Sequence, residues 1–266
     1  MVQDEDTREW SDAPTENIGA VSTSNKFLKD PFNFRYMVAS ADIYLTPLSV
    51  LTAQVWGAVR LEAIELWTEA FPGVPCLLVL SGDQILPKIE DLNRIATSKT
   101  TLRCYDVKQY YTNVPLQDLH DKLGDVAEMV FARGTATLTG GNADPNNEYE
   151  TCLIIHSKSS GKKHEWRRLT PAQAAGAKFS KATKAISITQ ALRMAHIIIF
   201  NIYFWLGNVI MLQTIGIPMG ANPSPAFADL YLYAYEYAFA LQLWATAAGR
   251  DILCRFLAVV QCSFSG

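Results

Sequence analysis

Asp106 is the residue whose position in the sequence points most directly to chemistry. It follows Leu102 and Cys104, the apolar positions of a strand that we expect over 101–115 and that stops at Pro115. A carboxylate at a strand end is well placed to hold a hard cation whose remaining ligands are water and phosphate oxygens. Asp is also a common turn or cap residue, so this position alone leaves both interpretations open.

Residues 216–230, with the sequence GIPMGANPSPAFADL, form a second candidate site. Gly216 and Gly220 lie four positions apart among prolines, which predicts a rigid loop whose backbone can approach a flat ligand closely. The loop leads into a helix that we expect from Ala226 onward, with Phe227 and Leu230 on its apolar face. A loop rich in Gly and Pro is by itself an ordinary connection, so the interpretation depends on the whole string.

The two strings, about a hundred residues apart, resemble those of reverse transcriptases. YDVKQYYTNVP, beginning at Tyr105, looks like the motif that carries the first catalytic aspartate, and QTIGIPMGANPSPAFADLYL looks like the motif that packs on template and incoming nucleotide. NFRYMV over 33–38 resembles the fingers strand whose basic residue contacts the triphosphate. The Tyr-Thr-Asn-Val-Pro ending is most similar to Penelope-like retroelement enzymes, and the resemblance covers about residues 26–257.

The resemblance implies template-directed DNA synthesis from dNTPs on an RNA template with a DNA primer, using two Mg²⁺ ions. It makes Asp106 a metal ligand assisted by the Val107 carbonyl. It places the Tyr111 ring against the 2′-hydroxyl of a ribonucleotide and pairs Arg35 with triphosphate oxygens. The resemblance also implies that the templating base pair lies over Pro218, Met219 and Gly220. Judged without the resemblance, Tyr111 fits a core tyrosine equally well, and Arg35 fits a surface arginine better than a triphosphate contact.

The last residues depart from the pattern of this family. Reverse transcriptases carry a second acidic site, an aromatic-x-Asp-Asp turn, and the lead-in Arg255-Phe256-Leu257 matches it, but Ala258 and Val259 replace the two aspartates. Loss of a metal-ligating carboxylate removes on the order of several kcal/mol of transition-state stabilisation. We therefore expect a truncated reverse transcriptase with impaired synthesis, and the alternative is a non-catalytic nucleic-acid-binding remnant of a retroelement.

A basic block between His156 and Lys184 stands out in a chain with a formal charge of −3. Such a block is typical of a surface that contacts phosphates, and a solvated polar face has the same composition. The residues expected to contact nucleic acid are Lys158, Lys162, Lys163, Arg167 and Arg168.

Residues 195–212 form an apolar run about as long as a membrane-spanning helix. Its β-branched and aromatic residues, including Ile197, Ile199 and Tyr203, favour strands. The Leu206-Gly207-Asn208 step supplies the residues of a tight hairpin turn. We expect a buried β-hairpin and no membrane; a helix that spans at 195–212 is the less favoured alternative.

The composition indicates a folded protein of a reducing compartment. Hydrophobic residues make up 49% and charged residues 18%, which excludes a chain disordered throughout. The five cysteines are scattered without a C-x-x-C pair, which argues against a disulfide framework and a zinc site. The first residues lack a basic segment followed by an apolar run, so we expect no secretory signal and an intracellular location, nuclear or cytoplasmic.

These features predict an α+β fold with the fingers and palm of a right-hand polymerase, a ferredoxin-like antiparallel palm sheet backed by helices, and no thumb. The expected parts are a mobile acidic segment over 1–25, a fingers region over 26–100, and a palm over 101–266 with a loop and basic insertion at about 132–184.

Within these parts the patterns predict individual elements. We expect a strand at 33–38, helices at 49–71 and 117–133, and a strand pair over 150–169 that turns at 159–161. A palm without its thumb exposes apolar side chains and favours self-association. The candidates for this surface are Tyr235, Phe239, Leu243 and Trp244.

Overall fold

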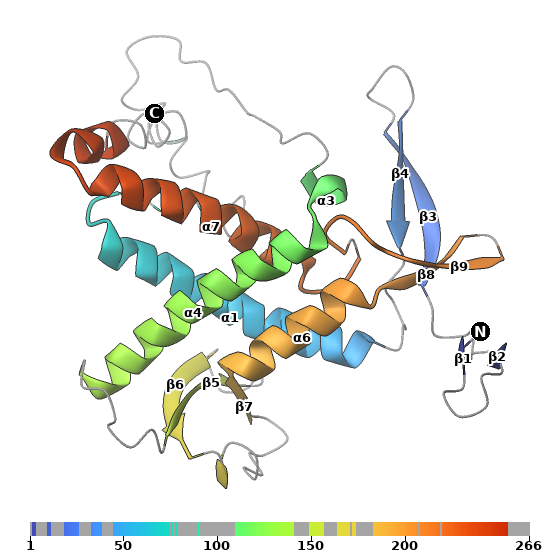
Figure 1. The fold of residues 1–266 in the computed structure, drawn as a ribbon, viewed down its shortest axis with the longest axis horizontal. Helices are drawn as coiled ribbons and strands as arrows, with labels where there is room; N and C mark the ends of the chain where they lie inside the picture. The colour runs from blue at the N-terminus through green and yellow to red at the C-terminus, as the bar shows by residue number, and fades with distance from the viewer. Residues whose placement is uncertain are drawn as a thin grey trace.

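The computed structural model describes the helices and strands that form the core, together with parts of their connections (Figure 1). For the strands before residue 45 and for residues 205–206 it describes the backbone only. The described residues are 2–3, 10–11, 19–26, 33–38, 45–74, 76, 78, 90, 110–140, 149–156, 164–170, 172–173, 183–206, 208–218 and 220–254.

Four long helices form the core, and the first of them contacts the other three. They are α1 (Thr46–Ala70), α4 (Leu116–Thr139), α6 (Ile188–Phe200) and α7 (Ser224–Trp244). In Figure 1, α4 lies between α7 and α6 and contacts both. Helix α1 confirms the helix expected over 49–71, and α7 confirms the helix expected after the Gly/Pro-rich loop.

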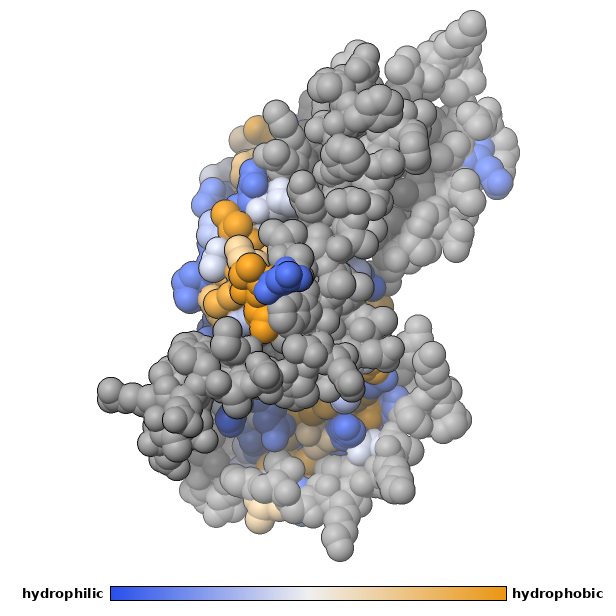
Figure 2. Space-filling view, turned by 90° about the vertical axis from the view of Figure 1, so that its right-hand side faces the viewer, coloured by the Kyte–Doolittle hydropathy of each residue, from blue (hydrophilic) through white to orange (hydrophobic). Residues whose placement is uncertain are grey.

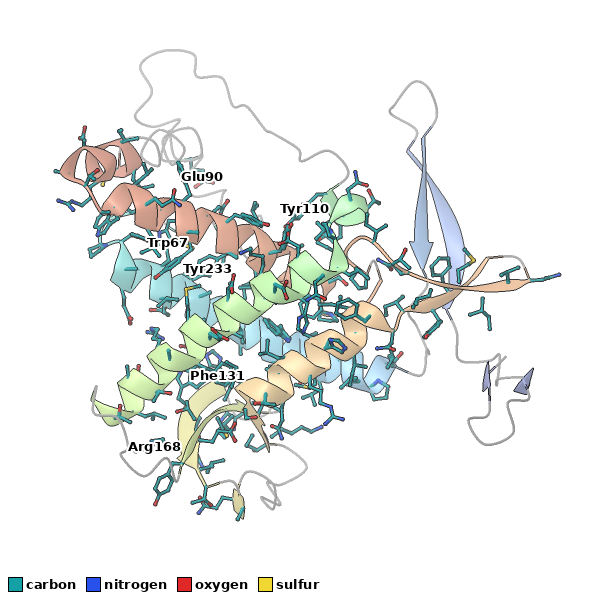
Figure 3. The ribbon with its side chains drawn as sticks, viewed as in Figure 1. Trp67, Glu90, Tyr110, Phe131, Arg168 and Tyr233 are labelled. Carbon is teal, nitrogen blue, oxygen red and sulfur yellow. The ribbon has the colours of Figure 1, made fainter. Side chains whose placement is uncertain are left out.

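Aromatic residues fill the space between α1 and α7. The Trp67 ring is almost fully buried and packs edge-on against Phe71 and Tyr237, while its indole N–H donates to the Val74 carbonyl at 3.1 Å. From α7, the hydroxyl of the buried Tyr233 donates to the Ala63 carbonyl at 2.8 Å (Figure 3). Because each buried polar atom of Trp67 and Tyr233 has a partner, these large rings contribute their full apolar burial to stability.

Two sheets flank the helices and give the molecule an α+β fold. One has β5 (Glu150–His156) between β6 (His164–Leu169) and β7 (Thr183–Ser187), with both pairings antiparallel. The β5–β6 pair confirms the strand pair expected over 150–169, and its turn at 159–161 lies outside the described residues.

The second sheet has the order β4-β3-β8-β9. Its strands are β3 (Gly19–Lys26), β4 (Asn33–Val38), β8 (Tyr203–Leu206) and β9 (Val209–Leu212). Strand β4 confirms the strand expected at 33–38. Strand β3 falls largely within 1–25, the segment expected to be mobile, which therefore contributes a strand to this sheet. Strands β3 and β8 run parallel, whereas the other neighbours are antiparallel. Two short strands, β1 (Val2–Gln3) and β2 (Trp10–Ser11), pair separately.

The apolar run over 195–212 is half helix and half hairpin. The hairpin prediction holds for β8 and β9, which pair from Tyr203↔Leu212 to Leu206↔Val209. The expectation that this hairpin is buried is wrong, because Val209 is 58% and Leu212 43% exposed. The strand prediction for Ile197 and Ile199 is wrong, because α6 continues to Phe200. The β-branched side chains are tolerated there since the inward face of α6 is buried in the core, and burial outweighs intrinsic propensity. Among the described residues, no helix has both the length and the apolar character that crossing a membrane requires.

The segment before α4 also differs from the expected strand over 101–115. Residues Tyr110–Asn113 form one helical turn, α3, while positions 101–109 lie outside the described residues. Helix α4 then runs six residues past the expected end at Arg133, to a left-handed Gly140 with φ 61°. Its extension is explained by packing, because Gly134 lies against the Trp166 ring of β6, where a Cβ would come within 2.6 Å.

A buried carboxylate joins the first sheet to the helices. Glu62 of α1 accepts hydrogen bonds from Arg133 of α4 at 2.5 Å, from His164 Nε2 at 2.7 Å and from the Trp166 indole at 3.0 Å. Arg133 also binds Glu69, which lies two helical turns beyond Glu62 on α1. Burial by itself raises the carboxyl pKa, but the hydrogen bonds from His164 and Trp166 and the Arg133 charge outweigh it and hold the pKa of Glu62 below its usual value.

We expect Glu62→Gln to lower the free energy of unfolding by about 2–4 kcal/mol at neutral pH, because it leaves Arg133 and His164 without their shared anion. The stabilisation is present above the ordinary Glu pKa of 4.5 and is lost as the pH falls through the lowered pKa of the folded state. Urea unfolding at several pH values measures both the loss in free energy of unfolding and its dependence on pH. Glu65→Gln, on the exposed side of α1, is the matched control, and equal losses for the two variants would contradict the prediction.

Candidate functional site

The two strings singled out in the sequence meet through backbone hydrogen bonds. The Gly216 N–H donates to the Val114 carbonyl and the Ile217 N–H donates to the Tyr111 carbonyl, both at 2.8 Å. Pro115 and Ile215 form an antiparallel bridge beside them. The segment over 110–115 and the Gly/Pro-rich loop, far apart in sequence, therefore form one structural unit.

Gly216 is required where these segments meet. Its φ is +88°, and a Cβ built on it would come within 2.6 Å of the Tyr111 carbonyl oxygen. Gly220 also has a positive φ, of 93°. Only glycine adopts such conformations without steric cost, which accounts for both glycines of the string.

The rest of the loop is tied to itself and to α1. The Ser224 hydroxyl donates to the Pro218 carbonyl, and the Ala221 N–H donates to the same carbonyl at 3.3 Å. The Asn222 N–H donates to the hydroxyl of Ser49, a residue of α1 that is 2% exposed. These contacts agree with the rigid loop expected from the sequence.

Two tyrosines line the seam between α3 and α7. The Tyr110 hydroxyl donates to the Ala228 carbonyl at 2.6 Å, so α3 is fixed to the first turns of α7 (Figure 3). The Tyr111 ring packs edge-on against Tyr110 and is half-buried. Burial and the neighbouring Asp229 charge raise the pKa of Tyr111, so its hydroxyl stays protonated at neutral pH.

An ion pair lies beside these tyrosines. Arg60 of α1 binds Asp229 of α7 through an N···O contact of 2.5 Å, and both side chains are partly exposed. The sequence reasoning missed Arg60, although it is the sole basic residue of α1, a sign that was available in the sequence. Because Asp229 already has a cationic partner, its carboxylate is not free to replace a missing metal ligand.

Several candidate residues lie outside the described part of the chain. This holds for Asp106, for the positions that replace the Asp-Asp pair, and for part of the basic block, so their predictions stand untested. Arg35 lies on β4, where its backbone pairs with Ser24 of β3. Among the described residues, no group of three or more His, Cys, Asp or Glu side chains could hold a metal ion. The candidate residues outside the description are Asp106, Val107, Lys158, Lys162, Lys163, Met219, Ala258 and Val259.

The described arginines of the basic block both have partners. Arg167 is exposed and binds Glu165 at 2.5 Å, and the Arg168 guanidinium lies over the Tyr149 ring at 5.0 Å (Figure 3). An exposed ion pair is worth little to stability, yet it neutralises the Arg167 charge, which would otherwise attract a phosphate.

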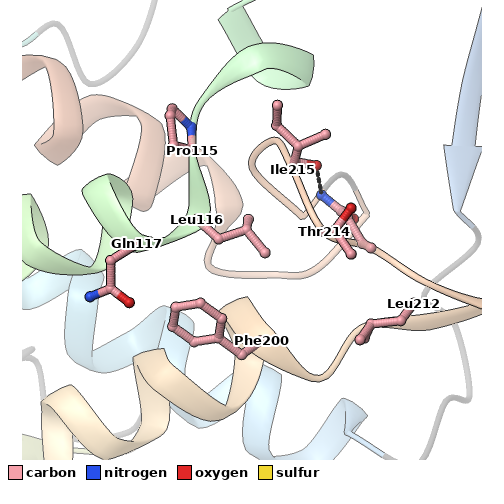
Figure 4. A pocket seen from close by; sticks show the side chains of 8 residues that line it. Pro115, Leu116, Gln117, Phe200, Leu212, Thr214 and Ile215 are labelled. Atoms are coloured by element: carbon pink, nitrogen blue, oxygen red, sulfur yellow. Dashed lines mark hydrogen bonds between the residues drawn. The ribbon is translucent and has the colours of Figure 1, made fainter.

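An open pocket of about 430 Å³ borders the seam (Figure 4). Its walls are mostly apolar, and one of its polar side chains is engaged, because the Gln213 amide donates to the Ile215 and Gly216 carbonyls. The lining residues are Pro115, Leu116, Gln117, Phe200, Leu212, Gln213, Thr214 and Ile215.

The side of α7 expected to be exposed is only partly so. Tyr235 and Phe239 are exposed, as predicted. Leu243 and Trp244 were expected on the same surface, but they are half-buried and pack against the core, with Trp244 edge-on to Phe71. The exposed part of this surface is therefore smaller than the sequence indicates.

No protein-family model matches this sequence, and a search of curated proteins finds none similar to it. The likeness to reverse transcriptases therefore depends on the residues of the two strings themselves.

We expect Gly216→Ala to lower the free energy of unfolding by about 3 kcal/mol, because a Cβ would both meet the Tyr111 carbonyl and strain the backbone. Gly73→Ala is the control: Gly73 has a similar φ of +81° but open space around it, and its loss should be about 1 kcal/mol. Thermal or urea unfolding compares the two variants, and equal losses would contradict the expected cost of the close contact at Gly216.

Glu236 of α7 is the one carboxyl among the described residues whose pKa lies above its usual value overall, because burial raises it to about 7. A raised folded-state pKa means that stability falls as the pH rises from the ordinary value of 4.5 to about 7. We expect Glu236→Gln to remove this loss, so that the variant gains up to about 3 kcal/mol over the parent chain between pH 5 and pH 8. Urea unfolding at both pH values tests this, with the exposed Glu128→Gln as control; a gain independent of pH would contradict it.

Proposed function

We propose that this chain is the fingers and palm of a retroelement reverse transcriptase that binds a primer–template and in which DNA synthesis is impaired. The observation that carries the proposal is the backbone pairing of Tyr111 and Val114 with Ile217 and Gly216. It supports the proposal because the two strings that resemble polymerase motifs are adjacent in space, as a shared nucleotide site requires.

The described residues supply surfaces for a paired nucleic-acid end, in this proposal. The Pro218 carbonyl is held by two hydrogen bonds, and this fixed backbone is the proposed platform for a base pair. The Tyr111 ring is half-buried beside the loop and is the proposed barrier to a ribose 2′-hydroxyl. Arg35, on β4, is the proposed partner of the triphosphate.

The residues present do not fit a two-metal centre. The described part of the chain holds no cluster of metal-binding groups, and Asp229 is already paired with Arg60. Ala258 and Val259 stand where the family has its aspartates, and neither side chain has an oxygen. Asp106 would be the sole catalytic carboxylate, which is the reason for proposing impaired synthesis.

The test measures binding and synthesis separately. We expect the purified chain to bind a labelled poly(rA)·oligo(dT) primer–template with an affinity that falls as salt rises. We expect it to extend the primer with dTTP and Mg²⁺ no better than Asp106→Asn. The double variant Ala258→Asp with Val259→Asp should extend the primer at least about 100-fold faster than the parent chain, since it restores the missing carboxylates.

Each outcome bears on a different part of the proposal. Absence of primer–template binding by a folded chain overturns the proposed function. Robust extension by the parent chain that Asp106→Asn abolishes would retain the function and overturn the impairment. Binding without any gain from the double variant would favour the non-catalytic nucleic-acid-binding remnant.

A further inference from the structure

Strand β9 is an edge of the second sheet. Among the described strands the order β4-β3-β8-β9 ends at it, and it pairs with β8 alone. An edge strand carries a row of unpaired N–H and C=O groups that can receive another strand.

The outward groups of β9 can be assigned. The Gln213 N–H donates to the Ile202 carbonyl at 2.9 Å, toward β8. Successive residues of a strand direct their N–H and C=O groups to alternate sides. The N–H and C=O groups of Val209 and Met211 therefore also face β8. The N–H and C=O groups of Ile210 and Leu212 consequently face outward.

This edge lacks the features that normally prevent strand pairing. Residues 194–228 contain no Asp, Glu, Lys or Arg, and β9 contains no proline. Its side chains are apolar and exposed: Val209 is 58% and Met211 42% exposed. Figure 2 shows apolar side chains gathered on the side of the molecule where the hairpin projects. Proteins usually protect such an edge with charges, proline or a bulge.

We propose that β9 pairs antiparallel with β9 of a second copy of this chain. Two-fold symmetry with Met211 opposite Met211 of the second copy places Ile210 opposite Leu212 of the second copy, and the reverse. All four outward residues then exchange hydrogen bonds. A second copy is the occupant that the sequence favours, because it brings an equally uncharged, unpaired edge of the same length, so neither partner buries a charge.

The size of the contact sets its strength. Each strand is four residues long, so the contact buries far less surface than the about 800 Å² per partner of a stable dimer. The dimer is therefore weak and forms at high protein concentration. The inference concerns a different surface from the nucleic-acid site and does not depend on the proposed function.

Sedimentation at increasing concentration tests the proposal, with circular dichroism to confirm folding. We expect a monomer–dimer equilibrium that Met211→Lys weakens by at least about tenfold, because it places two cations opposite each other. Leu212→Pro should weaken it similarly, because it removes an outward N–H without removing a β8–β9 hydrogen bond. Phe239→Lys, on the exposed side of α7, is the control that should leave the dimer unchanged.

A cross-linking experiment gives a positive readout. Residues that oppose each other across a non-hydrogen-bonded antiparallel pair have Cα atoms about 4.5 Å apart, within reach of a disulfide. Under mild oxidation Met211→Cys should form a covalent dimer, while Val209→Cys and the parent chain should not. A monomer at all concentrations, a dimer lost with Phe239→Lys alone, or equal cross-linking of the two cysteine variants would overturn the proposal.

Discussion

Two backbone hydrogen bonds, from Gly216 and Ile217 to the segment over 110–115, are the contact on which the candidate site depends. They join segments that are about a hundred residues apart, and they are possible because Gly216 has no Cβ and a φ that other residues rarely adopt. Everything proposed for the site assumes this seam. The segment over 110–115 forms one side of the seam, and Gly216 and Ile217 form the other.

Helix α1 is the common support of the site and of the first sheet. Three of its polar residues each bind a different part of the chain: Ser49 holds the Gly/Pro-rich loop, Arg60 holds α7, and Glu62 holds β6 and α4. Between them the helix buries large rings such as Trp56 and Trp67. Because the burial of polar groups is costly unless they are paired, these contacts fix the relative positions of the elements more specifically than apolar packing does.

The described charges at the site pair with one another. The one carboxylate at the seam, Asp229, is paired with Arg60, and Tyr111 beside it stays protonated. The resemblance to reverse transcriptases supplies one further acid, Asp106, where two metal ions require more. In the proposed function, holding a duplex end and extending it therefore depend on different residues, and Ala258 and Val259 bear on the proposed extension alone.

The sequence by itself determined the elements with strong local patterns: the helix expected over 49–71, the β5–β6 pair, the β8–β9 pair and the helix after the Gly/Pro-rich loop. Helical spacing and turn residues act over a few positions, so they can be read locally. Tertiary structure alone decided that Ile197–Ile199 are helical, that α4 passes Gly134, and that Arg60 meets Asp229. These outcomes depend on which distant surfaces bury each side chain, and no local pattern contains that information.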